Sequence, residues 1–118
     1  KDLLMNNGWQ CMTKQKSLGT DFVNLPDTSH LKSISLSDMN SSAFLRVDNI
    51  PGKQASVKIL YAISQANDFK ISSKQASTGI TLFGDYTEEE IQQPDSHPNI
   101  RLLLNIIEKD EVWKLEAD

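Results

Sequence analysis

The chain is 118 residues long, which is the size of one domain and leaves no room for a second independent core. Its 12 basic and 16 acidic residues give a formal net charge of −4, and no basic cluster is present to bind a nucleic-acid backbone. With 38% hydrophobic residues and no long Pro, Gly or Ser tract, the composition predicts a folded domain with a modest core.

The cysteine content and the beginning of the chain bear on compartment and domain limits. A single cysteine, Cys11, excludes an internal disulfide and a cysteine-rich zinc site, and it favours the reducing cytoplasm. No apolar run approaches the length of a membrane span or a signal-peptide core. Residues 1–16 are polar and lack periodicity, so we interpret them as a flexible leader in which Met12 resembles an ordinary start. We expect residues 1–11 to be dispensable and residues 17–118 to form a single α+β domain.

The first half of the chain predicts a short helical segment followed by an antiparallel hairpin. Apolar residues within 18–25 indicate one or two helical turns, which Pro26 ends. Polar and apolar residues then alternate over 31–38 and again over 43–49, which is the period of half-buried strands. Turn-forming residues separate these two stretches, as expected for a hairpin.

A strand–helix junction follows the hairpin. Ile50-Pro51-Gly52 ends the strand, because proline lacks an N–H donor and glycine permits a tight turn with positive φ. A broad apolar face then predicts a helix over 53–67. Residues 69–71 are expected to form a short strand.

The next segment predicts two short helices on either side of a strand. A capping box at Ser72–Gln75 begins a helix over 73–78, and Gly79 stands where a helix C′ residue is expected. Ile80–Phe83 is rich in β-forming residues and is the best candidate for a central strand. A second capping box, Thr87–Glu90, contains three acidic residues. We interpret them as the solvated start of a helix, where the helix dipole favours negative charge.

The last helix and strand complete the expected fold. Apolar residues at spacings of three and four predict a buried helix that begins within Asp95–Pro98, with proline at or near its first turn, and ends at Lys109-Asp110. Residues 112–115 are expected to form a final strand. Without the first strand and the short helices, the order is β-α-β-β-α-β, as in ferredoxin-like sandwiches. We therefore predict an α+β sandwich whose antiparallel sheet has an extra N-terminal strand and two main helices on one face.

Most catalytic and cofactor chemistries have no matching pattern in the sequence. His30 and His97 have no further His or Cys at ligand spacing, so we predict no metal site. There is no G-x-S-x-G motif for a nucleophile and no glycine-rich loop for phosphate. We therefore predict no catalytic residue and no cofactor.

Two stretches contain the candidate binding residues. At the strand–helix junction, unpaired N–H groups at the helix start and the nearby Lys53 suit a small anionic ligand or an amino acid. At the start of the last helix, a cap followed by proline explains the residues without a ligand. A tight turn without a ligand also explains the first stretch, and it is the commoner case. The first stretch comprises Asn49, Pro51, Gly52, Lys53, Gln54 and Ser56, and the second comprises His97 and Asn99.

The stretch from Phe44 to Ile71 resembles an ACT domain, a small regulatory module that binds amino acids. As in that family, a strand over Leu45–Asn49 leads through Pro51-Gly52 into the first helix. The resemblance implies an ACT-like fold with a ligand near this turn, usually at a dimer interface. A homodimer is therefore one of the alternatives.

A closer resemblance is to a family of small bacterial proteins of unknown function. It rests on the motif Asn49–Ser56, on Ile59–Ala62, and on the His-Pro-Asn-Ile motif that begins His97–Leu104. The resemblance extends from about Thr20 to Leu115 and implies no activity.

We accordingly predict a cytoplasmic bacterial protein that binds a small ligand or acts as a regulatory module without catalysing a reaction. One alternative is an interaction protein that pairs through an edge strand, for which 31–38 is the candidate. Another is a small enzyme that uses His97 as acid or base beside Asp95 or a glutamate. We expect neither nucleic acid nor a membrane as a partner.

Overall fold

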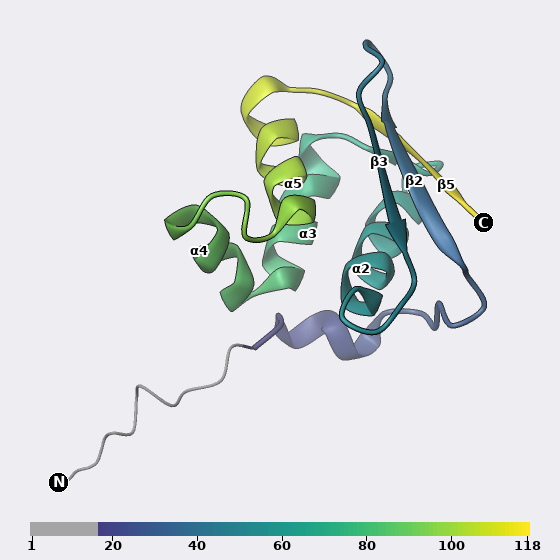
Figure 1. Cartoon of the computed structure of the whole chain (residues 1–118), viewed down its shortest axis with the longest axis vertical. Coiled ribbons are helices and arrows are strands. Elements are labelled where there is room, and N and C mark those ends of the chain that lie inside the picture. The colour runs from purple at the N-terminus through teal and green to yellow at the C-terminus, as the bar shows by residue number, and fades with distance from the viewer. Residues whose placement is uncertain (1–16) are drawn as a thin grey trace, which may run out of the picture.

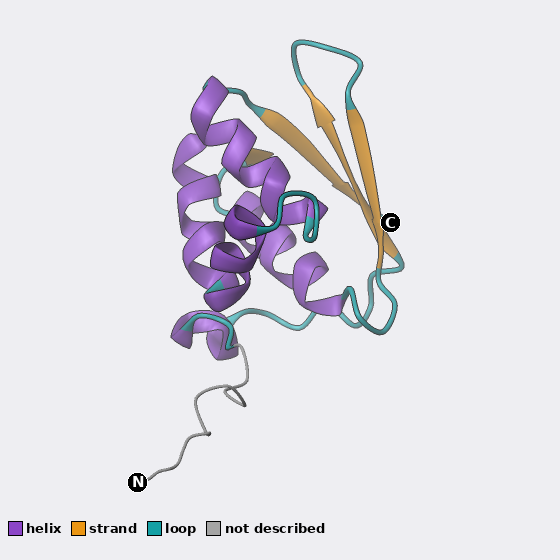
Figure 2. Cartoon of the chain, turned by 60° about the vertical axis from the view of Figure 1, so that its left-hand side comes forward, coloured by secondary structure: helices purple, strands orange, loops and turns teal. Residues whose placement is uncertain are grey.

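The strands of the molecule lie in one layer and its helices in another. The computed structural model describes residues 17–118. A four-stranded antiparallel sheet has helices on one of its faces (Figures 1 and 2), which confirms the predicted α+β class. The expectations about the leader, Cys11 and the start at Met12 lie outside the described residues.

The sheet contains two central strands and two edge strands, in the order β3-β2-β5-β4. Every neighbouring pair is antiparallel, and the predicted hairpin is confirmed. Its turn is stabilised locally, because the Asp38 carboxylate accepts the N–H of Asn40 at 2.9 Å. The strands are β2 (Ser33–Asp38), β3 (Phe44–Asp48), β4 (Lys70–Ile71) and β5 (Trp113–Ala117).

The helices follow the predicted order over most of the chain. The helical turns in 18–25, the long helix over about 53–67 and the long helix that ends at Lys109-Asp110 are confirmed. The capping box at Ser72 is confirmed as well, because the side-chain oxygen of Gln75 accepts the Ser72 N–H at 3.1 Å. The helices are the 3₁₀ helix η1 (Thr20–Asn24), α2 (Gln54–Gln65), α3 (Ser73–Phe83), α4 (Asp85–Gln92) and α5 (Pro98–Lys109).

Alternation along the strands separates a buried face of the sheet from an exposed one. Ile34, Leu36 and Leu115 are buried against the helices and belong to the core. The intervening side chains are polar, and Lys114 and Glu116 of β5 are exposed. One apolar face and one solvated face are usual for an antiparallel sheet that helices cover on one side.

The prediction of a central strand over Ile80–Phe83 is wrong, because α3 continues through these residues. Gly79, which was expected to end the helix, is buried in its middle. A Cβ atom at Gly79 would lie 2.8 Å from Leu103 Cδ1 and 3.0 Å from Ile63 Cδ1. The missing side chain thus lets α3 approach α5 and α2 closely, and core packing of residues such as Leu82 outweighs the β preference of this segment.

The ferredoxin-like and ACT-like arrangement is not confirmed, since one of its strands is helical. The strands on either side of α2, which are β3 and β4, lie at opposite edges of the sheet with two strands between them. A split β-α-β unit places only one strand between the two that it joins. The expectation that strand 31–38 is an edge is also wrong, because β2 is paired on both sides, with β3 and β5.

α4 begins three residues earlier than the second capping box predicts, since its N-cap is Gly84 rather than Thr87. The helix starts at Asp85, directly after Gly84 in its positive-φ conformation. Thr87 therefore lies inside the first turn, where its hydroxyl donates to the carbonyl oxygen of Ile80 at 2.9 Å. Of the glutamates that follow, Glu88 is exposed in the first turn as the sequence predicts, but Glu90 is completely buried and is not part of a solvated helix start.

The buried apolar face of α5 provides a test of how the helices pack. We expect Leu103→Ala to lower the free energy of unfolding by about 2–5 kcal/mol, because it leaves a cavity where α3 meets α5. Ile107→Ala on the same helix is the control, since Ile107 is 37% exposed and its truncation costs much less. Urea denaturation measures both, and equal costs would contradict the assignment of the buried face.

Candidate functional site

A cleft with a volume of about 390 Å³ lies where the first turns of α2 and α5 meet the junction between α3 and α4. Its size is within the range of small-molecule sites, and its lining mixes apolar side chains with a few polar ones. The lining residues are Leu18, Gly52, Lys53, Ala55, Ser56, Phe83, Tyr86, Ser96, His97, Pro98, Asn99 and Ile100.

The start of α2 forms the first wall of the cleft. The Pro51-Gly52 turn places Gly52 at φ +92°, as the sequence predicts, and the Lys53 N–H donates to the Ile50 carbonyl at 2.9 Å. Lys53 is the N-cap residue, and its carbonyl accepts the Val57 N–H at 3.1 Å. The N–H groups of the first turn precede any intrahelical acceptor, so they are available to an anion.

The other predicted residues of this junction do not line the cleft. The side-chain amide of Asn49 donates to the carbonyl oxygens of Thr28 and Leu31, at 3.0 and 2.8 Å. Asn49 therefore fixes the loop before β2. Pro51 and Gln54 are exposed and are absent from the cleft lining.

His97 and Asn99 lie at the start of α5, in the same cleft as Gly52, Lys53 and Ser56. The two stretches that the sequence nominates separately are therefore neighbours in the fold. The expectation that proline opens the helix is confirmed, since Pro98 is its first residue.

The cap expected at the start of α5 is present as a backbone position but not as a side-chain bond. His97 is the N-cap residue, but its side chain makes no capping bond. Nε2 of its ring instead lies 2.6 Å from Oε1 of Glu89, and the ring meets Tyr86 edge-on with centroids 5.6 Å apart. The acid/base alternative stays a prediction, with Glu89 rather than Asp95 as the carboxylate beside the ring.

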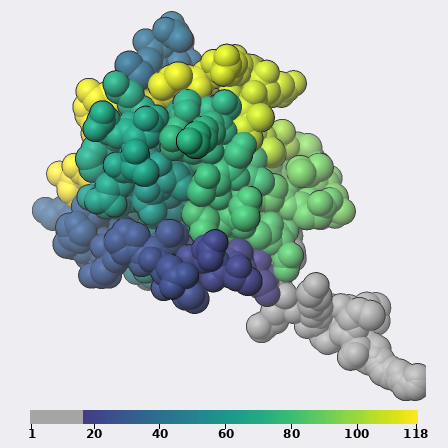
Figure 3. Space-filling view, turned by 180° about the vertical axis from the view of Figure 1, so that it is seen from behind, coloured from purple at the N-terminus to yellow at the C-terminus, as the bar shows by residue number. Residues whose placement is uncertain are grey.

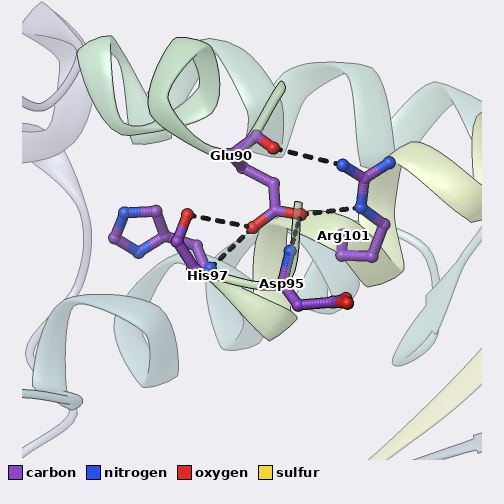
Figure 4. A network of polar contacts seen from close by, with 5 residues as sticks. Glu90, Asp95, His97 and Arg101 are labelled. Atoms are coloured by element: carbon purple, nitrogen blue, oxygen red, sulfur yellow. Dashed lines mark hydrogen bonds and ion pairs between the residues drawn. The ribbon is translucent and has the colours of Figure 1, made fainter. Parts of the chain in front are cut away.

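A buried carboxylate fixes the loop between α4 and α5 (Figure 4). Oε2 of Glu90 accepts the Asp95 N–H at 2.8 Å and the Arg101 Nε at 2.7 Å, while Oε1 accepts the His97 N–H at 2.6 Å. Arg101 also donates to the Glu90 carbonyl at 3.2 Å. These bonds hold the backbone of His97 at the cleft, with its ring turned away from the Glu90 carboxylate.

The same contacts determine the protonation state of Glu90. Burial is the largest influence and by itself raises the pKa of Glu90. The N–H groups of Asp95 and His97 and the guanidinium of Arg101 act in the opposite direction, and together they hold the pKa below its ordinary value. Glu90 is therefore ionised at neutral pH, although it is buried.

The segment before η1 completes the cleft wall. The Gly19 N–H donates to the Leu82 carbonyl at 2.8 Å, and Ser17 exchanges hydrogen bonds of 3.0 and 2.9 Å with Asp85. A Cβ atom at Gly84 would clash with the Ser17 carbonyl oxygen, so glycine permits this close approach. Figure 3 shows the first described residues, in purple, along the lower edge of the helical layer.

Two further properties concern metals and membranes. Within residues 17–118, no group of three or more His, Cys, Asp or Glu side chains is placed to hold a metal ion. None of the helices described in this range is both long enough and apolar enough to cross a membrane.

Comparison with known proteins places the chain in a family. The profile of the family described as uncharacterised proteins conserved in bacteria, DUF2322, matches residues 19–117. The chain belongs to this family. The predicted resemblance to a bacterial family of unknown function is thereby confirmed, and membership assigns no activity. No curated protein and no solved structure gives a significant match.

Sequence reasoning missed the apolar walls of the cleft and the buried ion pair. Leu18 precedes η1, Phe83 lies on α3 and Tyr86 lies on α4, and no local pattern joins them. Glu90 and Arg101 are eleven residues apart on different helices. Arg101 lies outside the apolar stripe of the last helix, so no pattern in the sequence marks it as the partner of a buried charge.

The turn geometry of Gly52 leads to a stability prediction. Nothing lies within 4 Å of a Cβ atom built at this position, so a side chain would meet no steric clash. It would be unfavourable only because L-residues rarely adopt the positive φ. We expect Gly52→Val to lower the free energy of unfolding by about 1–3 kcal/mol, and Gly52→Asn to cost less, because asparagine tolerates this region. Urea denaturation compares them, and equal costs would show that φ does not determine the effect.

The Glu90 network leads to a pH prediction. The folded-state pKa of Glu90 lies below its unfolded value, so its contribution to stability is complete above about pH 4.3. That contribution is lost as the pH falls through the folded-state pKa. We expect Glu90→Gln to lower the free energy of unfolding by about 2–3 kcal/mol at neutral pH, with a smaller difference from wild type in acid.

Urea denaturation across the acidic range measures this difference. Glu88→Gln is the matched control, because Glu88 is exposed on the same helix and its substitution costs at most about 0.5 kcal/mol. The role assigned to the charge of Glu90 is contradicted if the free energies of unfolding of wild type and Glu90→Gln differ by the same amount at every pH.

Proposed function

We propose that the protein binds a small carboxylate-bearing molecule in the cleft between the first turns of α2 and α5. The observation that supports this most strongly is the meeting of Lys53, Ser56 and His97 in one cavity of about 390 Å³. The cavity is large enough for a ligand the size of an amino acid or a small aromatic acid.

The α2 wall supplies the groups that suit a carboxylate. The N–H groups of the first turn point toward the beginning of the helix, where the helix dipole also favours a negative charge. Lys53 and the hydroxyl of Ser56 lie beside them and provide further donors. The positive φ of Gly52 allows the chain to turn into the helix without a side chain at that position.

The remaining walls suit the apolar body of such a ligand. Phe83, Tyr86 and Ile100 come from three different helices and line the same cavity as Leu18, which precedes η1. A bare inorganic anion would leave these side chains without contacts, whereas a carboxylate with an apolar body would cover them. A carboxylate attached to a hydrocarbon group therefore matches the lining better than phosphate does.

A titration with phenylacetate tests this proposal. We expect the amide NMR signals of Lys53–Ser56 and of Asn99 and Ile100 to shift, with smaller shifts for the uncharged phenylacetamide. Lys53→Gln should leave the fold intact, because Lys53 is exposed, and should raise the dissociation constant about threefold to fivefold.

Lys109→Gln is the matched control, with the same loss of charge. Lys109 is the last residue of α5, whereas the cleft lies at its first turn, so this variant should bind phenylacetate as wild type does. Absence of any shift around the cleft, or an equal loss of affinity in both variants, would contradict the proposal.

A further inference from the structure

β3 is an edge strand with one open side. The Asp38 N–H donates to the Ala43 carbonyl at 3.0 Å, and the Asn49 N–H donates to the Lys32 carbonyl at 2.9 Å. These two bonds involve residues 43 and 49 of the β3 segment, and every second residue of an antiparallel strand forms such a pair with its neighbour. The backbone N–H and C=O groups of the odd-numbered residues therefore point toward β2. The backbone N–H and C=O groups of the even-numbered residues 44, 46 and 48 therefore point away from β2, toward the open side.

The side chains at these positions form an ordered pattern. Phe44 is 63% exposed, and Arg46 and Asp48 follow it on the same exposed face of the sheet. Arg46 Nε lies 3.0 Å from Asp48 Oδ1 in the same strand, and pairing with a second copy would exchange this exposed contact for two contacts between strands. Ile50 comes two residues later, directly beyond the strand, and is 47% exposed. Along the edge the order is apolar, positive, negative, apolar, which is complementary to itself when read in the opposite direction.

We infer that two copies of this chain pair through β3, antiparallel, with the two-fold axis at Val47. In this register Arg46 lies opposite the partner's Asp48, and Asp48 lies opposite the partner's Arg46. Phe44 then lies opposite the partner's Ile50. Two opposite-charge pairs and two apolar pairs therefore form across one symmetric interface, which extends both sheets into one.

The backbone pattern agrees with this register. Arg46 and Asp48 both direct their N–H and C=O groups to the open side, so they can form a hydrogen-bonded pair across the axis. The Asp48 carbonyl already accepts the Ile50 N–H at 3.0 Å, and its second lone pair remains for the partner strand. A two-fold axis at Arg46 would instead place two arginines opposite each other, which is unfavourable.

Charge reversal tests the register directly. Arg46→Asp and Asp48→Arg each convert both opposite-charge pairs into like-charge pairs. Sedimentation equilibrium over a concentration series should give a monomer–dimer equilibrium for the wild type, and a dissociation constant about tenfold higher for each variant. An equimolar mixture of the two variants should restore dimers, because every facing pair is again of opposite charge.

Controls separate this interface from general charge effects. Lys70→Asp changes the net charge as Arg46→Asp does, but at the opposite edge strand β4, and should leave the dissociation constant unchanged. Circular dichroism should show that each variant folds, since Arg46 and Asp48 are exposed. A monomeric wild type, variants that dimerise as wild type does, or a mixture that stays monomeric would each overturn the inference.

Discussion

The buried carboxylate of Glu90 is the constraint on which the cleft depends. Glu90 lies on α4, yet it binds the N–H groups of Asp95 and His97 and the side chain of Arg101 on α5. A buried charge without partners is strongly unfavourable, so the loop is held where it supplies them. Asp95 keeps a positive φ of 74° within this loop, and His97 and the start of α5 remain at the wall of the cleft.

The local elements of the fold could be predicted because each has a local cause. Alternation defines the β2–β3 hairpin, and the Ser72–Gln75 capping box defines the start of α3. The segment Ile80–Phe83 could not be predicted, since its β preference is intrinsic but its helical state depends on packing against distant residues. Gly79 shows why. The local sequence is typical of a helix end, whereas glycine at this position lets α3 approach Leu103.

The two stretches of the candidate site could be predicted from the sequence, but their meeting in one cleft could not. The sequence identifies the Gly52–Ser56 turn and the His97–Asn99 turn by their glycine, proline and polar residues. Their meeting in one cleft depends on the direction of α5, which Glu90 and the sheet topology determine. The pair Glu90–Arg101 was missed because an acidic residue near a helix start is explained equally well by the dipole, and only burial distinguishes the two roles.

Amide hydrogen exchange at Asp95 and His97, measured by NMR, tests the central claim most directly. Both N–H groups are bonded to a buried carboxylate, so in the wild type they should exchange slowly although they lie in a loop. In Glu90→Gln they should lose protection, while the core amide of Leu103 retains it. Exchange in the wild type as fast as in unbonded loop amides would contradict the claim that Glu90 holds this side of the cleft.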